Sequence, residues 1–209
     1  MFTFSAIIAS LATSVWAIPA LNTRQTGASC AGFGSGSTDS PGYNFTLTAH
    51  NTTLPNTNST GVPLILGWGP PGQTSTEASI WAISTYAEWH SNEWPSFSLS
   101  SGALYPNPGP DEQGLGAYDY DIAPGAEVGF YVLPADPGRQ NPEIYCAALR
   151  DDDVMLAVNN DADSFSLCQA VPDPYPSNVL VYTADASNSA VYDYNTCYAV
   201  QVHLIPSYG

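Results

Sequence analysis

Apolar and polar side chains alternate along several short stretches of this chain. The clearest is 197–205, where Tyr198 and Leu204 belong to one apolar face and Gln201 and His203 to the other. A period of two is typical of a β-strand with one buried face. Similar runs, rich in aromatic and β-branched residues, cover 43–49, 63–67, 79–87, 96–100, 127–133, 143–149, 154–158, 164–168, 178–183 and 197–205. Because helical periodicity is hard to find, these runs predict ten or more strands.

Proline and glycine separate these runs. The segments richest in proline are 106–116, 134–142 and 171–177. Such segments are typical of loops, so the chain is expected to turn often between short strands. Many short strands at this spacing predict one all-β domain over 43–209, a compact β-sandwich or a barrel-like fold. A β-trefoil is the alternative, although the sequence has no visible internal repeat.

The amino-terminal stretch carries the features of an export signal. Residues 2–15 contain no charged side chain, and the stretch ends on the small-x-small pattern Val15-Trp16-Ala17. A membrane-spanning helix needs about 20 apolar residues, more than are present here. We therefore expect residues 1–17 to be a signal peptide and 18–42 a flexible linker. The protein is expected to be secreted, extracellular or cell-wall-associated, with no membrane partner.

The charge balance narrows the possible partners further. Arg24, Arg139 and Arg150 are the only basic residues apart from histidine, and the formal net charge is −16. Such a surface repels phosphate, which makes nucleic acid and anionic lipid poor partners. The main effect expected of the acidity is solubility, and the oligomeric state stays open. The 13 Tyr and 7 Phe are too many for a disordered chain.

Four cysteines follow the leader, at positions 30, 146, 168 and 197. An even number in an exported chain predicts two disulfides, with three possible connectivities. We favour Cys146 with Cys168, which would join neighbouring strands, and Cys30 with Cys197, which would fasten the amino-terminal segment to the last strand. A metal site would need short paired spacings such as C-x-x-C, which are absent.

Asn44, Asn51 and Asn58 each begin an Asn-X-Thr glycosylation sequon. Three sequons so close together behind a leader predict a glycan-bearing surface. Because Asn44 falls inside a strand-like run, it must face solvent if it is occupied. The polar stretch 52–58 is expected to form an exposed loop.

Aromatic residues gather in one segment that is a candidate carbohydrate-contact surface. Trp89 and Trp94 flank the polar turn 90–93 and are expected to be exposed. Trp81 shares one face of a strand-like run with Ile83 and is expected to point inward. Exposed indoles stack on the apolar faces of sugar rings. Core packing or loop anchoring is nevertheless the favoured role of these side chains, and carbohydrate contact is the alternative. The candidate carbohydrate contacts are Trp89, Trp94, Tyr86, Glu88 and Glu93.

Carboxylates offer a second kind of chemistry. Glu88 and Glu93 are a candidate pair for acid hydrolysis, although a close pair is also expected by chance among 19 carboxylates. The stretch 159–164 resembles the start of a calcium loop but lacks its Gly and its final Glu. A hairpin turn between 154–158 and the strand ending at Cys168 is the favoured interpretation.

Other catalytic classes lack their motifs. The chain has no G-x-S-x-G and no H-E-x-x-H, and it lacks a phosphate-binding glycine loop. His50, His90 and His203 are far apart in sequence and are interpreted as single surface or structural histidines. The sequence therefore predicts no catalytic residue, no metal and no cofactor.

Several short runs resemble fungal secreted cell-wall proteins of the phialide-development type. The resemblance rests on 97–105, 129–132, 165–168 and 178–184, together with a cysteine before the closing strand. It spans Phe97 to Leu204 and implies a wall-associated or shed protein without assigned catalytic residues.

The sequence thus favours a secreted, non-catalytic glycoprotein that is associated with the cell wall or contacts carbohydrate, with wall polysaccharide as a candidate partner. The first alternative is a secreted acid hydrolase of the glycosidase kind that uses paired carboxylates. The second is a secreted effector that binds another protein, a function that leaves no mark in the residues.

Overall fold

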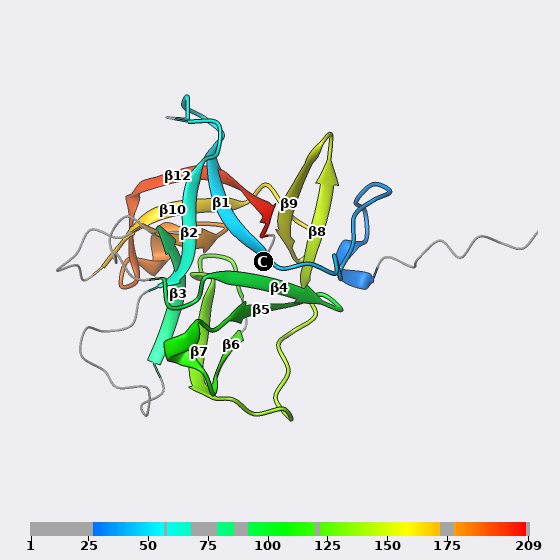
Figure 1. Ribbon diagram of the computed structural model, residues 1–209. Helices are drawn as coiled ribbons and strands as arrows, with labels where there is room; N and C mark the ends of the chain where they lie inside the picture. The colour runs from blue at the N-terminus through cyan, green and yellow to red at the C-terminus, as the bar shows by residue number, and fades with distance from the viewer. Residues whose placement is uncertain are drawn as a thin grey trace, which may run out of the picture.

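The computed structural model describes residues 27–56, 58–67, 79–85, 92–119, 122–171 and 178–207. In this part of the chain the regular structure is almost entirely β, as predicted (Figure 1). The strands are β1 (Phe45–Asn51), β2 (Val62–Gly67), β3 (Ser79–Thr85), β4 (Ser96–Ser100), β5 (Ala103–Asn107), β6 (Leu115–Asp119), β7 (Gly129–Pro134), β8 (Tyr145–Arg150), β9 (Asp153–Val158), β10 (Phe165–Ala170), β11 (Asn178–Tyr182) and β12 (Tyr192–Pro206). Three short 3-10 turns, η1 (Ala28–Cys30), η3 (Pro110–Glu112) and η4 (Ala186–Asn188), complete the elements. No helix within these ranges is long and apolar enough to cross a membrane.

Six antiparallel strands close into a barrel in the order β1, β2, β3, β11, β10, β12 and back to β1. The closing pair is extensive, because β1 and β12 run side by side from Phe45 opposite Pro206 to Asn51 opposite Val200. The barrel therefore takes three consecutive strands from each end of the described chain. A trefoil would instead draw its barrel strands from three equivalent units.

Alternating side chains of the barrel strands fill its interior. Leu47 on β1 and Val202 on β12 are fully buried there, while His50 and His203 lie on the outer face of the same two strands. This is the period-two pattern that the sequence shows, now closed around one core. The core side chains of the barrel strands are Phe45, Leu47, Ala49, Leu64, Leu66, Ile83, Phe165, Leu167, Leu180, Tyr182, Val200, Val202 and Leu204.

Three hairpins extend the barrel. β4–β5 joins β1 where Phe97 lies opposite Phe45, β6–β7 joins β3, and β8–β9 joins β12 where Met155 lies opposite His203. The sequence did not predict β5 or β6, because proline and glycine marked their region as loop. β5 accommodates Pro106 because it is the terminal strand of the sheet order, where a missing N–H costs little.

The amino-terminal segment 27–42 is part of the domain, so the prediction of a flexible linker is wrong for these residues. Thr38 pairs with Ala147 on β8 through two backbone hydrogen bonds of 3.0 and 2.9 Å. Cys30 and Phe33 pack with Met155 in a small second core. Figure 1 shows this segment, in blue, beside β8. Residues 18–26 lie outside the described residues.

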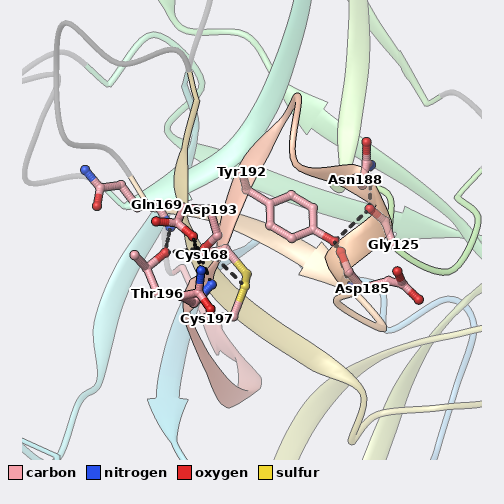
Figure 2. Close-up of a disulfide and its surroundings, with 10 residues drawn as sticks. Gly125, Cys168, Gln169, Asp185, Asn188, Tyr192, Asp193, Thr196 and Cys197 are labelled. Atoms are coloured by element: carbon pink, nitrogen blue, oxygen red, sulfur yellow. Dashed lines mark hydrogen bonds between the residues drawn. A yellow bond between two sulfur atoms is a disulfide. The ribbon is translucent and has the colours of Figure 1, made fainter.

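All four cysteines form disulfides, but the favoured pairing was wrong. The bonds join Cys30 to Cys146 and Cys168 to Cys197, with Cα–Cα distances of 5.2 and 4.1 Å. Cys146 and Cys168 cannot meet because β9 and β12 lie between their strands in the sheet order. Cys168 instead lies opposite β12 at the register shift between Leu167 and Gln169 (Figure 2).

The stretch 159–164 is also not the hairpin turn that was expected. It does connect β9 to β10, but β12 lies between these two strands, so they do not pair. The backbone at Asn159 and Asn160 is left-handed, with φ of 52° and 64°, a conformation that asparagine tolerates better than most residues. By contrast, β8 and β9 do form a hairpin, because Arg150 pairs with Asp153 across a turn at 151–152.

Candidate functional site

Trp94 does not lie at the exposed surface that the sequence predicts. Trp94 is fully buried in the main core, so its ring offers no face to a sugar. Its indole N–H finds no hydrogen-bond acceptor within the described residues. Trp81 is half-buried and packs against the same core, as expected. Tyr86, Glu88 and Trp89 lie outside the described residues.

Glu93 lies near a carboxylate that the sequence did not suggest. The pKa of Glu112 is raised, mainly by burial and then by the charges of Glu93 and Asp111. Glu93 accepts a hydrogen bond of 2.7 Å from the backbone N–H of Gly109 through its own carbonyl, which holds the two segments together. Glu112 from η3 is therefore close enough to Glu93 for their charges to interact.

A pocket of about 410 Å³ opens on the outer face of the barrel, where β1 and β12 close it. Seven of its eight lining residues carry a polar side chain. The residues that line it, which we call the histidine pocket, are Thr46, Thr48, His50, Ser59, Thr60, Asp153, His203 and Ile205. β1, β12, the start of β9 and the loop between β1 and β2 all contribute to it.

The strand register brings the two histidines of this pocket together. Thr48 lies directly opposite His203, and His50 is the next outward-facing residue on β1. Diagonal neighbours on antiparallel strands are close enough for aromatic rings to touch. The imidazole rings are accordingly stacked, with centroids 4.1 Å apart and planes at 27°.

Burial and neighbouring charges distinguish His203 from a simple surface histidine. The pKa of His203 is lowered, first by burial and then by His50, while Asp153 acts in the opposite direction. Asp153 Oδ1 lies 3.9 Å from Nδ1 of His203, and Thr48 Oγ1 lies 3.5 Å from Nε2 of His50. A neutral imidazole both donates and accepts a hydrogen bond, as hydroxyl groups do. The pocket can thus bind a ligand that carries many hydroxyl groups.

The loop between β1 and β2 forms one wall of the pocket because a glycine lets it approach. Gly61 has a left-handed φ of 72°, and a Cβ there would lie 2.7 Å from the His50 ring. Any other residue would therefore push the loop away from the barrel. A second, smaller pocket of about 160 Å³ on the same loop includes Asn51, Gly61 and Tyr198.

All three sequons lie around this region. Asn44 is exposed just before β1, Asn51 ends β1 and is half-buried, and Asn58 is exposed in the loop. The chain turns directly after Asn51 and again after Asn58. In each turn the asparagine Oδ1 accepts a hydrogen bond from the backbone N–H two residues later, that of Thr53 or Thr60. Asn44 is exposed, as its occupancy would require, although it lies just before β1 and not inside a strand.

The polar stretch 159–164 uses its side chains for structure. Asp163 forms an ion pair with Arg150 and accepts from Gln201, and Asn160 Nδ2 donates to the carbonyls of Ala28 and Ala31. Within the described residues no group of three or more His, Cys, Asp or Glu side chains is arranged to hold a metal ion. His90 lies outside those residues.

The histidine pocket cannot be predicted from local sequence patterns, in which each histidine stands alone. His50 and His203 are far apart in the chain, and only the pairing of the first and last strands unites them. Their shared position on outward-facing sites of two predicted strands was the available signal. Comparison with protein-family models, curated proteins and solved structures finds no match.

Proposed function

We propose that this protein is an exported, non-catalytic glycoprotein that contacts carbohydrate at the cell wall or cell surface, and that the histidine pocket is its contact site. The observation that carries the proposal is the lining of that pocket. It combines four hydroxyl side chains with two imidazoles and one carboxylate. Its volume falls within the range of small-molecule sites, roughly 300–1,000 Å³.

Carbohydrate suits this lining better than other small ligands do. Sugar hydroxyls donate and accept hydrogen bonds, and the pocket offers the same mixture in Thr48, His203 and Asp153. Ile205, which is 43% exposed, adds an apolar contact for the C–H face of a sugar ring. The strongly acidic chain disfavours phosphorylated or nucleic-acid ligands.

The surroundings of the pocket support an extracellular setting. Two disulfides fasten the domain, which fits an oxidising compartment. The sequons lie at exposed or half-exposed positions, where glycans can be attached. A wall-associated role is also what the resemblance to fungal cell-wall proteins implies.

The proposal is tested by sugar titration followed by NMR. The chain has three histidines, so their ring C–H signals are few and can be assigned. We expect chitin or β-glucan oligosaccharides to shift the signals of His50 and His203. Thr48→Val, which removes one hydroxyl at constant shape, and His203→Gln should each weaken binding about tenfold, the loss of roughly one good hydrogen bond.

Gln201→Ala is the matched control, because Gln201 lies on the outer face of β12 but does not line the pocket. It should leave the affinity unchanged. Failure of both oligosaccharide classes to shift either histidine, or equal weakening by all three variants, would contradict the proposal.

A carboxylate pair supports a secreted acid hydrolase as a second candidate. Glu112 carries the raised pKa expected of a general acid, and Glu93 is the charge beside it. Glycan and protein substrates should be screened at acidic pH with Glu93→Gln and Glu112→Gln. Activity that disappears in either variant would support this function, and activity that survives in both would exclude this pair.

A further inference from the structure

Two of the three sequons contribute directly to the histidine pocket. Thr46 is the third residue of the sequon at Asn44, and Ser59 and Thr60 complete the sequon at Asn58. The pocket is thus walled by residues that the glycosylation machinery itself recognises. A glycan on Asn58 would start beside the wall that Ser59 and Thr60 form.

Asn58 is the best placed of the three. Its side chain is exposed, and Oδ1 accepts hydrogen bonds of 3.1 Å from both the backbone N–H and the hydroxyl of Thr60. Within the described residues its amide nitrogen donates no hydrogen bond. Asn44 lies beyond the far end of the pocket, at the start of β1. Asn51 instead lines the smaller pocket.

We propose that an N-glycan on Asn58 is the resident ligand of the histidine pocket and that it covers Thr48, His50 and His203. The inference rests on the proposed function, because it assumes both export and an affinity of this pocket for sugar. In the export pathway the amide nitrogen of Asn58 attacks the anomeric carbon of a lipid-linked oligosaccharide. The new C–N bond forms as the bond to the lipid diphosphate breaks, and the amide gives one proton to a base of the glycosylation machinery.

Tethering makes this glycan a strong competitor. A ligand held by a short flexible link has an effective concentration in the millimolar range, so even a weak pocket affinity keeps it bound. Its attachment residue is next to two pocket residues, so the first sugars are within reach. A free oligosaccharide must displace this glycan to enter. Occupancy of one sequon would therefore control access to the pocket.

The glycan contact is tested on protein secreted by a eukaryotic host. Mass spectrometry gives the occupancy of each sequon, and endoglycosidase treatment of the folded protein gives the release rate of each glycan. We expect Asn58 to be occupied and its glycan to be released about tenfold more slowly than that of Asn44. Asn58→Gln should shift the ring signals of His50 and His203.

Two control variants distinguish the effect of the Asn58 glycan from the effects of changing the loop or of losing another glycan. Thr60→Ser keeps the sequon and should keep the slow release, and Asn44→Gln removes a glycan outside the pocket and should leave both histidines unshifted. The inference would be overturned if Asn58 is unoccupied, or if the glycans of Asn58 and Asn44 are released at equal rates. It would also be overturned if Asn58→Gln leaves the signals of His50 and His203 unshifted.

Affinity for added oligosaccharide distinguishes this inference from the proposed function. We expect chitin or β-glucan oligosaccharides to bind Asn58→Gln about tenfold more tightly than the glycosylated protein. Equal binding to both proteins would leave the proposed function standing and overturn the inference. A third outcome is slow release of the Asn58 glycan and shifted histidine signals in Asn58→Gln, but no binding of added oligosaccharide. It would support the resident glycan and contradict the proposal that the pocket binds an external carbohydrate.

Discussion

The charge of His203 links folding to pH. Burial and the neighbouring His50 lower its pKa in the folded protein. An unfolded chain binds the proton at the usual value of about 6.5. The unfolded state therefore holds more protons just below this pH, and stability rises with pH there. The contribution of His203 to stability is complete above about pH 6.5. It declines as the pH falls from there toward the lowered pKa of the folded protein.

His203→Gln should remove this contribution. We expect its free energy of unfolding, measured with urea, to fall less between neutral and mildly acidic pH than that of the unmodified protein. Asp153→Asn is the opposing control, because Asp153 raises the pKa of His203 and its loss should steepen the decline. Parallel pH profiles for all three proteins would show that His203 does not carry the effect.

Asn141 holds two strands together from a loop. Its buried side chain donates to the carbonyls of Leu104 on β5 and Ala117 on β6, at 2.6 and 3.2 Å, and accepts from the N–H of Asp119 at 3.0 Å. Asn141→Leu would leave these backbone groups buried and unpaired, at a cost of about 1–3 kcal/mol each.

We therefore expect Asn141→Leu to lower the free energy of unfolding by at least about 2 kcal/mol in urea titrations. Asn141→Asp has nearly the same shape and keeps the acceptor. Because its carboxylate cannot donate to the carbonyls of Leu104 and Ala117, it should be no more stable than Asn141→Leu. Recovery of stability in Asn141→Asp would assign the effect to side-chain shape rather than to the two donated bonds.

Single residues were the hardest features to predict from the sequence. The alternation pattern placed Trp81 correctly, because its neighbours are in a regular strand. Trp94 follows a polar turn and was expected to be exposed, yet it packs into the core beside β4. His50 and His203 looked isolated, since their contact depends on a strand pairing that no local pattern reveals.

At the level of elements, local pattern predicted strands well and their neighbours poorly. β4 spans the expected residues, and most other strands begin or end within two or three residues of the prediction. Sheet order is a non-local property, and so are the disulfide partners that depend on it. The structure places β12 between β9 and β10, which explains both the wrong cysteine pairing and the unexpected loop at 159–164.

The two disulfides should stabilise different elements. Cys30–Cys146 closes a span of 116 residues and fastens the amino-terminal segment to β8, whereas Cys168–Cys197 closes a span of 29 residues within the barrel. Loops of about 15 to 100 residues correspond to stabilisation of about 3 to 5 kcal/mol in the chain-entropy model. Removal of either bond should therefore lower stability substantially.

Hydrogen exchange distinguishes the two bonds. The double substitution Cys30→Ala with Cys146→Ala should raise exchange most at Thr38 and Ala147, whose amides join the segment to β8. The double substitution Cys168→Ala with Cys197→Ala should instead raise it in β10 and β12. Tyr192, whose hydroxyl ties Gly125 to Asp185, should keep the start of β12 attached (Figure 2). An identical exchange pattern in both variants would contradict this assignment.

At the scale of the whole molecule, charge rather than packing is the unusual feature. The net charge is −16 because only three arginines oppose 19 carboxylates. One of these arginines, Arg150, is already paired with Asp163. The remaining carboxylates repel one another across a small domain, and compaction brings them closer together. Folding is therefore opposed by an electrostatic term that salt can screen.

We expect the thermal midpoint at neutral pH to rise as sodium chloride increases. Between about 0.01 and 0.15 M salt the Debye length falls from about 30 to about 8 Å, so repulsion between distant carboxylates is largely removed. A gain of about 1 kcal/mol would raise the midpoint by about 2–4 °C for a chain of this size. The same salt series near pH 4.1, where the net charge is close to zero, should give little change. A midpoint that rises equally at both pH values would point to a general effect of salt on solvation, since screening of net charge must vanish where the net charge does.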